Sequence, residues 1–297
     1  MSSMIENWVK ELSFGEVQND KNFSITPIIS NFPSDLNFIT LRLAMEKKRV
    51  KVKEVDARGS VPEITVQNLA DEYLLIIDGE HLVGAKQNRI VNKTIIIPPK
   101  SDVFIPVTCT EEGRWHFESN EFRKSHYSAP STFRSAFKMK DSAQGEVWAE
   151  VRHRVSSYGV STDTSSLEDV YNKVDSSLSD YKKEITFVPN QIGFIAFIND
   201  EFAGLDIVND SGLFSELYDD MLSGYLIDAL DKHDGRKRKG RSENLRNQIF
   251  NEISKSKRSY AKRIGVETRS SIRGENVAGE LVSFNRKPVH IAVFPIN

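Results

Sequence analysis

Two polar clusters between residues 79 and 115 have the residue types that chemistry needs, and strongly apolar runs lie beside them. The first polar cluster is GEHLVGAKQNR (residues 79–89), and the second polar cluster is CTEEGRW (residues 109–115). Folded proteins normally place apolar residues inside and charged residues outside, so this alternation needs an explanation. Either the stretch is a β-meander with ordinary polar turns, or the two clusters meet at one end of a small sheet and form a polar site.

The first polar cluster contains Glu80, Lys86, Gln87, Asn88 and Arg89. The two cations suit phosphates or carboxylates, and the two amides can hydrogen-bond a base, a ribose or another amide. The carboxylate of Glu80 is a candidate acid or base for hydrolysis. The alternative is a solvated loop with an arginine–glutamate pair, which contributes less than about 1 kcal/mol when exposed.

The second polar cluster offers Cys109, Glu111, Arg114 and Trp115. A thiolate nucleophile needs a nearby base or cation, which Arg114 can supply. However, Cys109 follows an apolar strand, and we expect it to be a small buried hydrophobic residue. Glu111 is a second candidate acid or base, and Trp115 can stack on a planar ring.

Several well-known motifs are absent from the sequence. The six histidines show neither HxxxH nor HExxH spacing and there is no CxxC, so we expect no metal site and no cofactor. The sequence also lacks a Walker A loop, a GxGxxG motif after a strand and a GxSxG elbow. These absences argue against a kinase, a Rossmann dehydrogenase and an α/β-hydrolase.

The composition is that of a soluble globular protein. The chain has 297 residues, of which 39% are hydrophobic and 28% charged, with a formal net charge of −2. No apolar run reaches the roughly 18 residues that a membrane-spanning helix needs, so no membrane partner is expected. The N-terminus lacks the pattern of a signal peptide, and the single cysteine fits a reducing cytoplasm, so a cytoplasmic location is expected.

The elements that must position the clusters are mainly strands. Residues 1–23 are expected to be an N-terminal helical segment, and residues 24–115 contain short runs rich in Val, Ile, Thr and Phe, typical of an antiparallel sandwich. Asp78-Gly79 is a tight-turn signal between two of these strands. Residues 116–141 carry few periodic apolar positions, and we expect a long loop there.

Helical patterns dominate afterwards. Residues 143–159 and 162–185 have apolar residues at helical spacing, with Ser165 and Glu168 at capping-box spacing at the start of the second helix. Residues 191–208 resemble a buried hairpin, and residues 213–232 form the strongest helical pattern in the chain. The last 19 residues alternate as one or two strands. The fold class predicted is therefore α+β, with a β-sandwich-like N-terminal half and a helix-rich C-terminal half (residues 116–297) with returning strands, expected to form one compact domain.

A basic segment covers residues 232–263, where 12 Lys/Arg stand against 3 Asp/Glu. It includes a basic loop over residues 233–241 and is a candidate docking surface for an acidic protein or for nucleic acid. It lacks interleaved aromatic residues and an identified groove-reading helix. A solvated loop is therefore favoured over nucleic-acid binding.

The sequence resembles the ARPP domain family, whose name stands for ADP-ribosylglycohydrolase and rhodanese-phosphatase associated protein. The resemblance extends from about residue 24 to the end, and it rests on VPE, VQN, DGE, GAKQNR and CTEEGRW in this order, followed by residues 144–148, 193–206 and 213–230. It implies a bacterial protein associated with proteins that handle ADP-ribose and NAD derivatives. The matching positions make the two polar clusters the candidate site: Glu80, Gln87, Asn88, Arg89, Glu111, Arg114 and Trp115.

Two functional hypotheses follow. In the first, the protein recognises a nucleotide such as ADP-ribose: Arg89, Lys86 and Arg114 hold phosphates, Asn88 and Gln87 hold a ribose or base edge, and Trp115 stacks. If the protein is an enzyme, Glu80 or Glu111 acts as acid or base in hydrolysis. In the second, the protein is a non-catalytic interaction scaffold whose two clusters stabilise each other through Arg–Glu pairs. The observation that tests the candidate site is whether Glu80, Arg89, Glu111 and Arg114 come together in the fold within about the width of one ligand.

Overall fold

A computed structural model describes residues 8, 12–31, 35–56, 62–140, 143–238 and 243–296, and it confirms a mixed α+β fold. An N-terminal helical segment is expected over residues 1–23. Of its first 11 residues, Trp8 is described by the structure and the others lie outside the described residues. The residues that follow are not helical, because Ser13–Phe14 (β1) and Gln18–Asp20 (β2) are short strands that pair with Phe23–Ile29 (β3).

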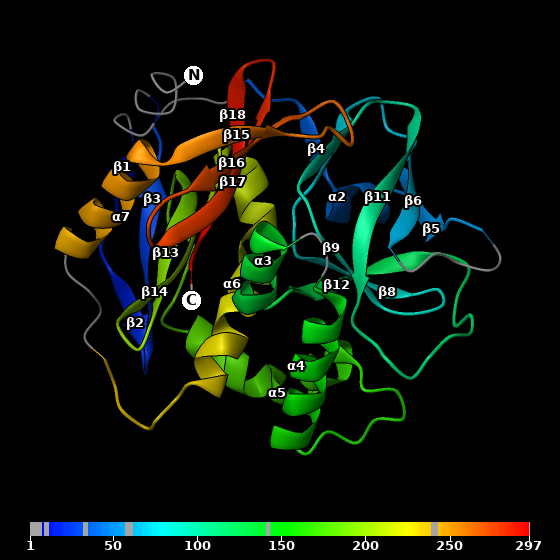
Figure 1. The fold of residues 1–297 in the computed structure, drawn as a ribbon, viewed down its shortest axis with the longest axis horizontal. Helices are drawn as coiled ribbons and strands as arrows, with labels where there is room; N and C mark the ends of the chain where they lie inside the picture. Colours follow the sequence, from blue (N-terminus) through cyan, green and yellow to red (C-terminus); the bar gives the residue numbers. More distant parts are fainter. Residues whose placement is uncertain are drawn as a thin grey trace.

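The largest sheet has nine strands, which come from both the N-terminal and the C-terminal parts of the chain (Figure 1). Its strand order is β1, β3, β13 (Gln191–Ile198), β14 (Glu201–Val208), β18 (Lys287–Pro295), β17 (Val277–Phe284), β16 (Thr268–Arg273) and β15 (Lys257–Ala261), with β2 on β3. The predicted hairpin is confirmed as β13–β14. Strand β3 pairs with β13 rather than with the strands that follow it in sequence, so the N-terminal strands divide between two regions of the molecule.

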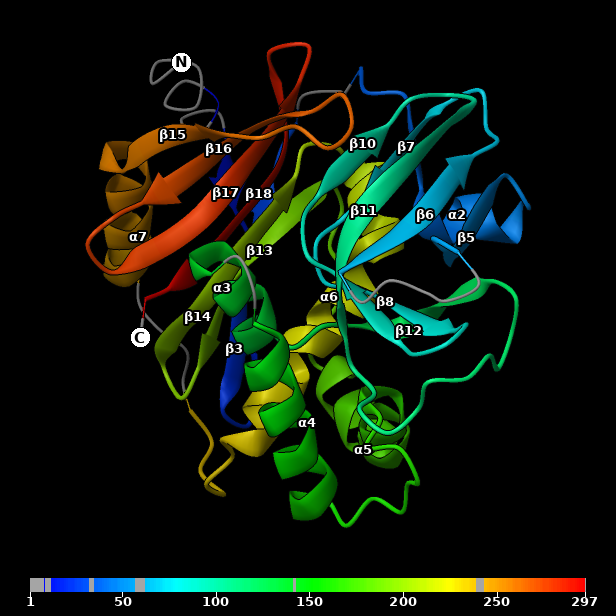
Figure 2. The same ribbon diagram turned by 45° about the vertical axis from the view of Figure 1, so that its right-hand side comes forward.

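The remaining strands form two smaller sheets beside the large one (Figure 2). One has the order β12 (Phe122–Ser128), β8 (Glu80–Gly84), β9 (Arg89–Val91), β11 (Ser101–Cys109), β6 (Glu63–Asn68) and β5 (Val50–Glu54). The other has the order β10 (Ile95–Ile97), β7 (Tyr73–Ile76) and β4 (Phe38–Thr40). The Asp78-Gly79 turn is present, with Gly79 at φ +92°, but the strands on its two sides belong to different sheets. The turn therefore carries the chain from one sheet to the other.

Six helices are present among the described residues, and they cover the sheets. Their bounds are α2 Leu41–Glu46, α3 Ser131–Met139, α4 Gln144–Ser157, α5 Leu167–Lys182, α6 Ser211–Asp231 and α7 Glu243–Lys255. The predicted helices α4, α5 and α6 are confirmed. The cap of α5 is shifted by one residue, because Ser166 accepts the bond from the Glu168 amide while Ser165 is left-handed at φ +48°.

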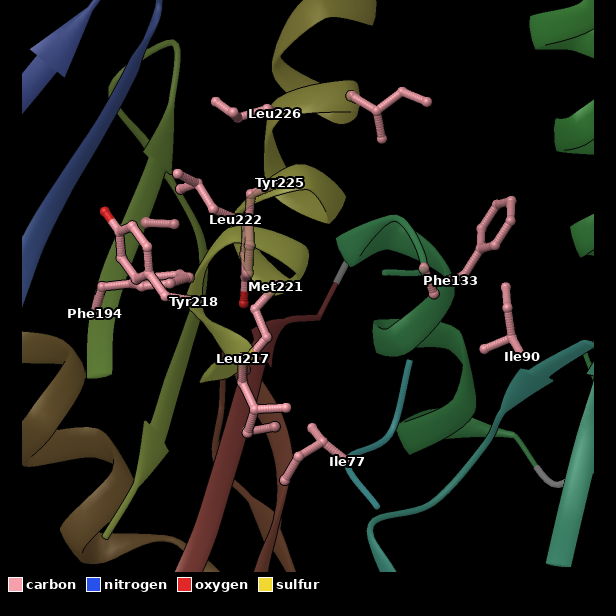
Figure 3. Packing of buried hydrophobic residues seen from close by; sticks show 14 of the residues in the cluster. Ile77, Ile90, Phe133, Phe194, Leu217, Tyr218, Met221, Leu222, Tyr225 and Leu226 are labelled. Atoms are coloured by element: carbon pink, nitrogen blue, oxygen red, sulfur yellow. The ribbon is translucent and has the colours of Figure 1, made fainter. Parts of the chain in front are cut away.

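Helix α6 is the core helix that its pattern predicts. It is buried nearly all round, as expected of a helix between layers. Its side chains pack on Phe194 of β13 on one side and reach Ile77 on the other (Figure 3). Helix α7 lies over the opposite face of the large sheet, where Ile249 and Ile253 contact the second set of alternating residues. Covering on both faces explains why β13 is a continuous apolar run.

The prediction of a long loop over residues 116–141 is wrong, because the stretch contains β12 and α3. The apolar periodicity is missing because charged side chains fill buried positions. Lys124 of β12 pairs with Asp220, and Arg134 of α3 pairs with Asp206, 72 residues away. Partners so distant in sequence leave no local signal.

No helix among the described residues is long and apolar enough to cross a membrane.

Candidate functional site

The two polar clusters meet, because β9 and β11 are neighbours. Their register places Cys109 opposite Arg89, and the Thr110 amide donates to the Asn88 carbonyl at 2.9 Å. The end of the first polar cluster and the start of the second therefore lie side by side. Nearly all their polar side chains are buried, with Glu112 and Trp115 as the exposed exceptions.

Arg114 ties the two clusters together. Its Nε and Nη2 donate to the two oxygens of Glu111 at 2.9 and 2.6 Å, which is a bidentate pair. The remaining donors reach the first cluster: Nη1 donates to the Ala85 carbonyl at 2.6 Å, and Nη2 also contacts Asn88 Oδ1 at 3.2 Å. We call Arg114, Glu111 and Asn88 the arginine lock. It is a saturated arrangement that leaves Arg114 no donor for a phosphate.

Glu111 is equally engaged. Besides Arg114, it accepts hydrogen bonds from the Thr164 hydroxyl at 2.7 Å and the Asn88 amide at 3.2 Å. Burial opposes ionisation of Glu111, but the bonds from Arg114 and Thr164 outweigh it and lower its pKa. A carboxylate held ionised by so many donors is a structural anchor rather than a proton carrier.

Arg89 is fully buried beside Cys109 and Glu54. Its Nη1 donates to Gln87 Oε1 at 3.2 Å and contacts the Cys109 thiol, and its Nη2 lies 3.5 Å from Glu54 Oε1. Arg89 Nε and Nη2 have no hydrogen-bond acceptor among the described residues. Burial raises the pKa of Cys109 to about 11 despite Arg89, so Cys109 is a neutral thiol. The expectation of a buried hydrophobic cysteine is confirmed.

Two exposed aromatic rings lie over the cations Lys86 and Arg89. Trp115 is 45% exposed and Phe117 is 46% exposed. The Lys86 ammonium lies 5.3 Å from the Trp115 ring centroid and 5.0 Å from that of Phe117, and Arg89 Cζ is 5.6 Å from the Trp115 ring. We call Trp115, Phe117 and Lys86 the aromatic platform. Both rings therefore have a cation on one side and solvent access.

The backbone on either side of the rings is pinned. The Gly113 amide donates to the Thr164 carbonyl at 3.1 Å, and the Glu118 amide donates to the Ala85 carbonyl at 2.9 Å. Arg114 Nη1 also reaches the His116 carbonyl at 3.3 Å. The arginine lock thus positions the aromatic platform without presenting its own polar groups.

Glu80 does not join the other candidates. It begins β8, four residues before Gly84, which is roughly 13 Å along a strand. One oxygen accepts from the Ile77 amide at 3.0 Å, and the other lies 3.7 Å from Lys124 Nζ. Burial raises the pKa of Glu80 to about 7, even though Lys124 favours the ionised form. Of the four residues expected to converge, Arg89, Glu111 and Arg114 lie near one another and Glu80 lies apart.

Sequence reasoning missed four residues of the site. Thr164 and Ser166, in the loop before α5, hydrogen-bond Glu111 and Asn88. Glu54 of β5 pairs with Arg89, and Phe117 completes the platform. Of these four residues, Phe117 could have been found from the sequence, because it is a second aromatic residue two positions after Trp115 in a polar stretch.

Within the part of the chain that the structure describes, no group of three or more His, Cys, Asp or Glu is arranged to hold a metal ion.

Comparison with known proteins identifies a family. The model of the ARPP-1 family, described as ARG and Rhodanese-Phosphatase-superfamily-associated Protein domain, matches residues 11–294. No curated protein and no solved structure matches the chain.

Proposed function

The chain belongs to the ARPP-1 domain family, and from this premise we propose that it binds an ADP-ribose-like nucleotide whose base stacks on the aromatic platform. The family description names ARG, the ADP-ribosylglycohydrolases, among its associates, which supports a ligand from ADP-ribose pathways. The observation that carries the proposal is the pair of exposed rings, Trp115 and Phe117, fixed over a cation.

Stacking suits this arrangement. Every base has a flat π-face, and stacking on an aromatic side chain contributes about 1–3 kcal/mol per base. The rings are held by pinned backbone, so little conformational freedom is lost when a base stacks. The positive charge of Lys86 and Arg89 beneath the rings also favours a ligand that carries phosphates.

We propose recognition rather than hydrolysis. Glu111 is occupied by Arg114, Thr164 and Asn88, so it has no free lone pair directed at a substrate. Glu80 has a pKa suited to proton transfer, but it is buried and lies on the far part of β8 from the platform. Neither carboxylate is placed to reach a glycosidic or phosphoester bond of a ligand stacked on Trp115.

The second candidate function is a non-catalytic interaction scaffold. The arginine lock favours it, since a saturated and buried Arg–Glu pair is what a purely structural role predicts. Both functions require the lock. They differ in whether the exposed rings bind a nucleotide or a protein.

Calorimetric titration with ADP-ribose, AMP and unphosphorylated ribose separates the two functions. We expect ADP-ribose and AMP to bind, and Trp115→Ala to weaken that binding at least tenfold, as loss of about 1.4 kcal/mol of stacking predicts. Phe104→Ala is the matched control, because Phe104 is a 57% exposed ring on β11 with no cation over it among the described residues. Absence of nucleotide binding, or equal binding by Trp115→Ala, contradicts the proposal.

A further inference from the structure

A cavity lined by several basic residues is a second candidate site. It has a volume of about 540 Å³ and lies between α2, β5 and β12. Its lining contains none of the residues of the arginine lock or the aromatic platform. A volume of this size is typical of sites for small organic ligands, which occupy about 300–1,000 Å³. We call it the basic cavity.

Positive side chains converge on the basic cavity from all three elements. Its charged and titratable lining residues are Arg42, Glu46, Lys48, Lys51, Glu121, Arg123, Lys124 and His126. Five of these are Lys or Arg and two are Glu. One of the two, Glu121, is paired with Lys53 at 3.3 Å, which lies outside the lining. The cavity therefore has an excess of positive charge.

The inner cations are held in place by a buried carboxylate. Asp220 of α6 pairs with both Arg42 and Lys124. Lys124 also donates to the Ser125 carbonyl at 3.3 Å, and Arg42 Nη1 contacts His126 Nδ1 at 3.1 Å. Asp220 is shared by the two cations, and Glu80 lies 3.7 Å from Lys124 Nζ, so the group keeps a net positive charge while Glu80 is protonated. The buried network fixes both cations. A preorganised cationic wall of this kind binds an anion with little rearrangement.

The outer cations of the cavity, Lys48, Lys51 and Arg123, make weaker or fewer ionic contacts. Lys48 and Lys51 are exposed and have no ion-pair partner among the described residues, while Arg123 makes a long contact of 3.7 Å with Glu168. They line the same cavity as the inner pair. Between the charges the lining is apolar, with Met45, Val50, Val52 and Phe122. The combination suits a phosphate group attached to a less polar organic body.

We infer that the basic cavity is a separate binding site for an organic phosphate, whose phosphate lies against Arg42 and Lys124 and is approached by Lys51 and Arg123. The site does not depend on the aromatic platform, and it goes beyond the nucleotide recognition proposed above. The buried Glu80 behind Lys124 is consistent with this role. Its pKa of about 7 leaves it largely protonated below neutrality, so it repels an incoming anion less.

Calorimetry with ribose 5-phosphate, inorganic pyrophosphate and unphosphorylated ribose at about 0.15 M salt tests the inference, since such salt screens weak surface attraction. We expect the two phosphorylated probes to bind and ribose not to bind. The double variant Lys51→Gln/Arg123→Gln should raise the dissociation constant at least tenfold, because both side chains are exposed and their loss leaves the buried network intact. Lys47→Gln is the control, because Lys47 is exposed next to Lys48 but does not line the cavity.

The Trp115→Ala variant keeps this test separate from the proposed function. If the inference is right, that variant binds ribose 5-phosphate and pyrophosphate as tightly as the wild type. Loss of phosphate binding in Trp115→Ala shows a single site and overturns the inference. No binding by the wild type, or equal weakening in Lys47→Gln, overturns it as well.

Discussion

Arg114 is buried with its donors paired, and this pairing defines what it does. The bidentate bond to Glu111 and the bonds to the Ala85 carbonyl and Asn88 place it at the junction of the two clusters. A buried arginine without these partners is strongly unfavourable. We therefore assign Arg114 and Glu111 to positioning the platform, and not to contact with a ligand.

Breaking the arginine lock should destabilise the fold. We expect Arg114→Ala or Glu111→Ala to lower the free energy of unfolding by about 3–5 kcal/mol, because each leaves its partner buried and unpaired. Urea denaturation followed by circular dichroism measures this. Arg152→Ala is the matched control, since Arg152 pairs with Glu112 at the surface and should change stability by less than about 1 kcal/mol. Equal effects of the two substitutions would contradict the assignment.

Glu80 makes stability depend on pH in an unusual direction. Its pKa is about 7 in the folded protein against 4.5 ordinarily, so the folded state retains a proton that the unfolded state releases. Stability from this group is therefore full below about pH 4.5 and falls as pH rises through 7, by roughly 3 kcal/mol in total. Glu80 faces Lys124, Asp220 and Arg42, and Lys124 also pairs with Asp220.

The variant Glu80→Gln, which mimics the protonated form, tests this linkage. It should match wild-type stability at pH 5 and exceed it at pH 8, as measured by urea denaturation at both values. Glu63→Gln, on an exposed residue of β6, should show no such difference. A wild-type advantage at pH 8 would show that Glu80 is ionised and well paired there.

Among the elements, those with apolar faces were predictable and those with charged buried faces were not. Helix α6 and the β13–β14 hairpin follow from periodicity, since their buried sides are apolar. Helix α3 buries Arg134 and Lys138 together with its two phenylalanines, and their acidic partners come from β14 and from the turn before β8. Such pairs are invisible to a local pattern, which is why the stretch reads as a loop.

The candidate site was predictable to the same extent. Adjacent turns of neighbouring strands brought Asn88, Glu111 and Arg114 together, as the order of the strands allowed us to expect. The contribution of Thr164 and Ser166 was not predictable, because it depends on how the start of α5 docks on the strands. Glu80 begins a strand of the same sheet, but its carboxylate accepts from the Ile77 amide and faces Lys124, a partner distant in sequence that no local signal reveals.

Helix α3 depends on a cap supplied by another helix. Its first residues follow Pro130, which has no side-chain cap, and Asp228 of α6 accepts from the Thr132 amide at 3.0 Å and the Ser131 hydroxyl at 2.6 Å. Asp228 also pairs with the buried Arg154 at 2.6 Å. Asp228→Ala should therefore lower the free energy of unfolding by about 3–5 kcal/mol. Thermal or urea denaturation measures it.

The control for this prediction lies on the same helix. Asp219 is exposed on α6, so Asp219→Ala should stay within about 0.5 kcal/mol of the wild type. If Asp228→Ala is as mild as this control, α3 does not rely on Asp228.

At the scale of the whole molecule, a buried network joins the sheets. Arg134 of α3 donates two bonds to Asp206 of the large sheet at 2.8 and 2.6 Å, and one to Asp78, which leads into β8, at 3.2 Å. His290 of β18 bridges Asp206 and Thr94. The pairing with Arg134 and His290 overcomes burial and lowers the pKa of Asp206 to about 2.

This network should make the molecule unfold as one unit. Asp206→Asn is expected to lower the free energy of unfolding by about 3–5 kcal/mol while tryptophan fluorescence and circular dichroism still change together. In a Trp8→Phe/Trp148→Phe background, Trp115 alone reports the region of the small sheets, and circular dichroism reports the whole molecule. Two separated transitions would show that the large sheet and the small sheets are independently stable.

The most direct test of nucleotide recognition uses Trp115 itself as the reporter. In Trp8→Phe/Trp148→Phe, Trp115 is the single tryptophan left of three, and its fluorescence can be followed during titration with ADP-ribose. A base stacked on the ring predicts saturable quenching by ADP-ribose and AMP, and none by ribose 5-phosphate. Quenching that is absent, or identical for all three compounds, contradicts the account.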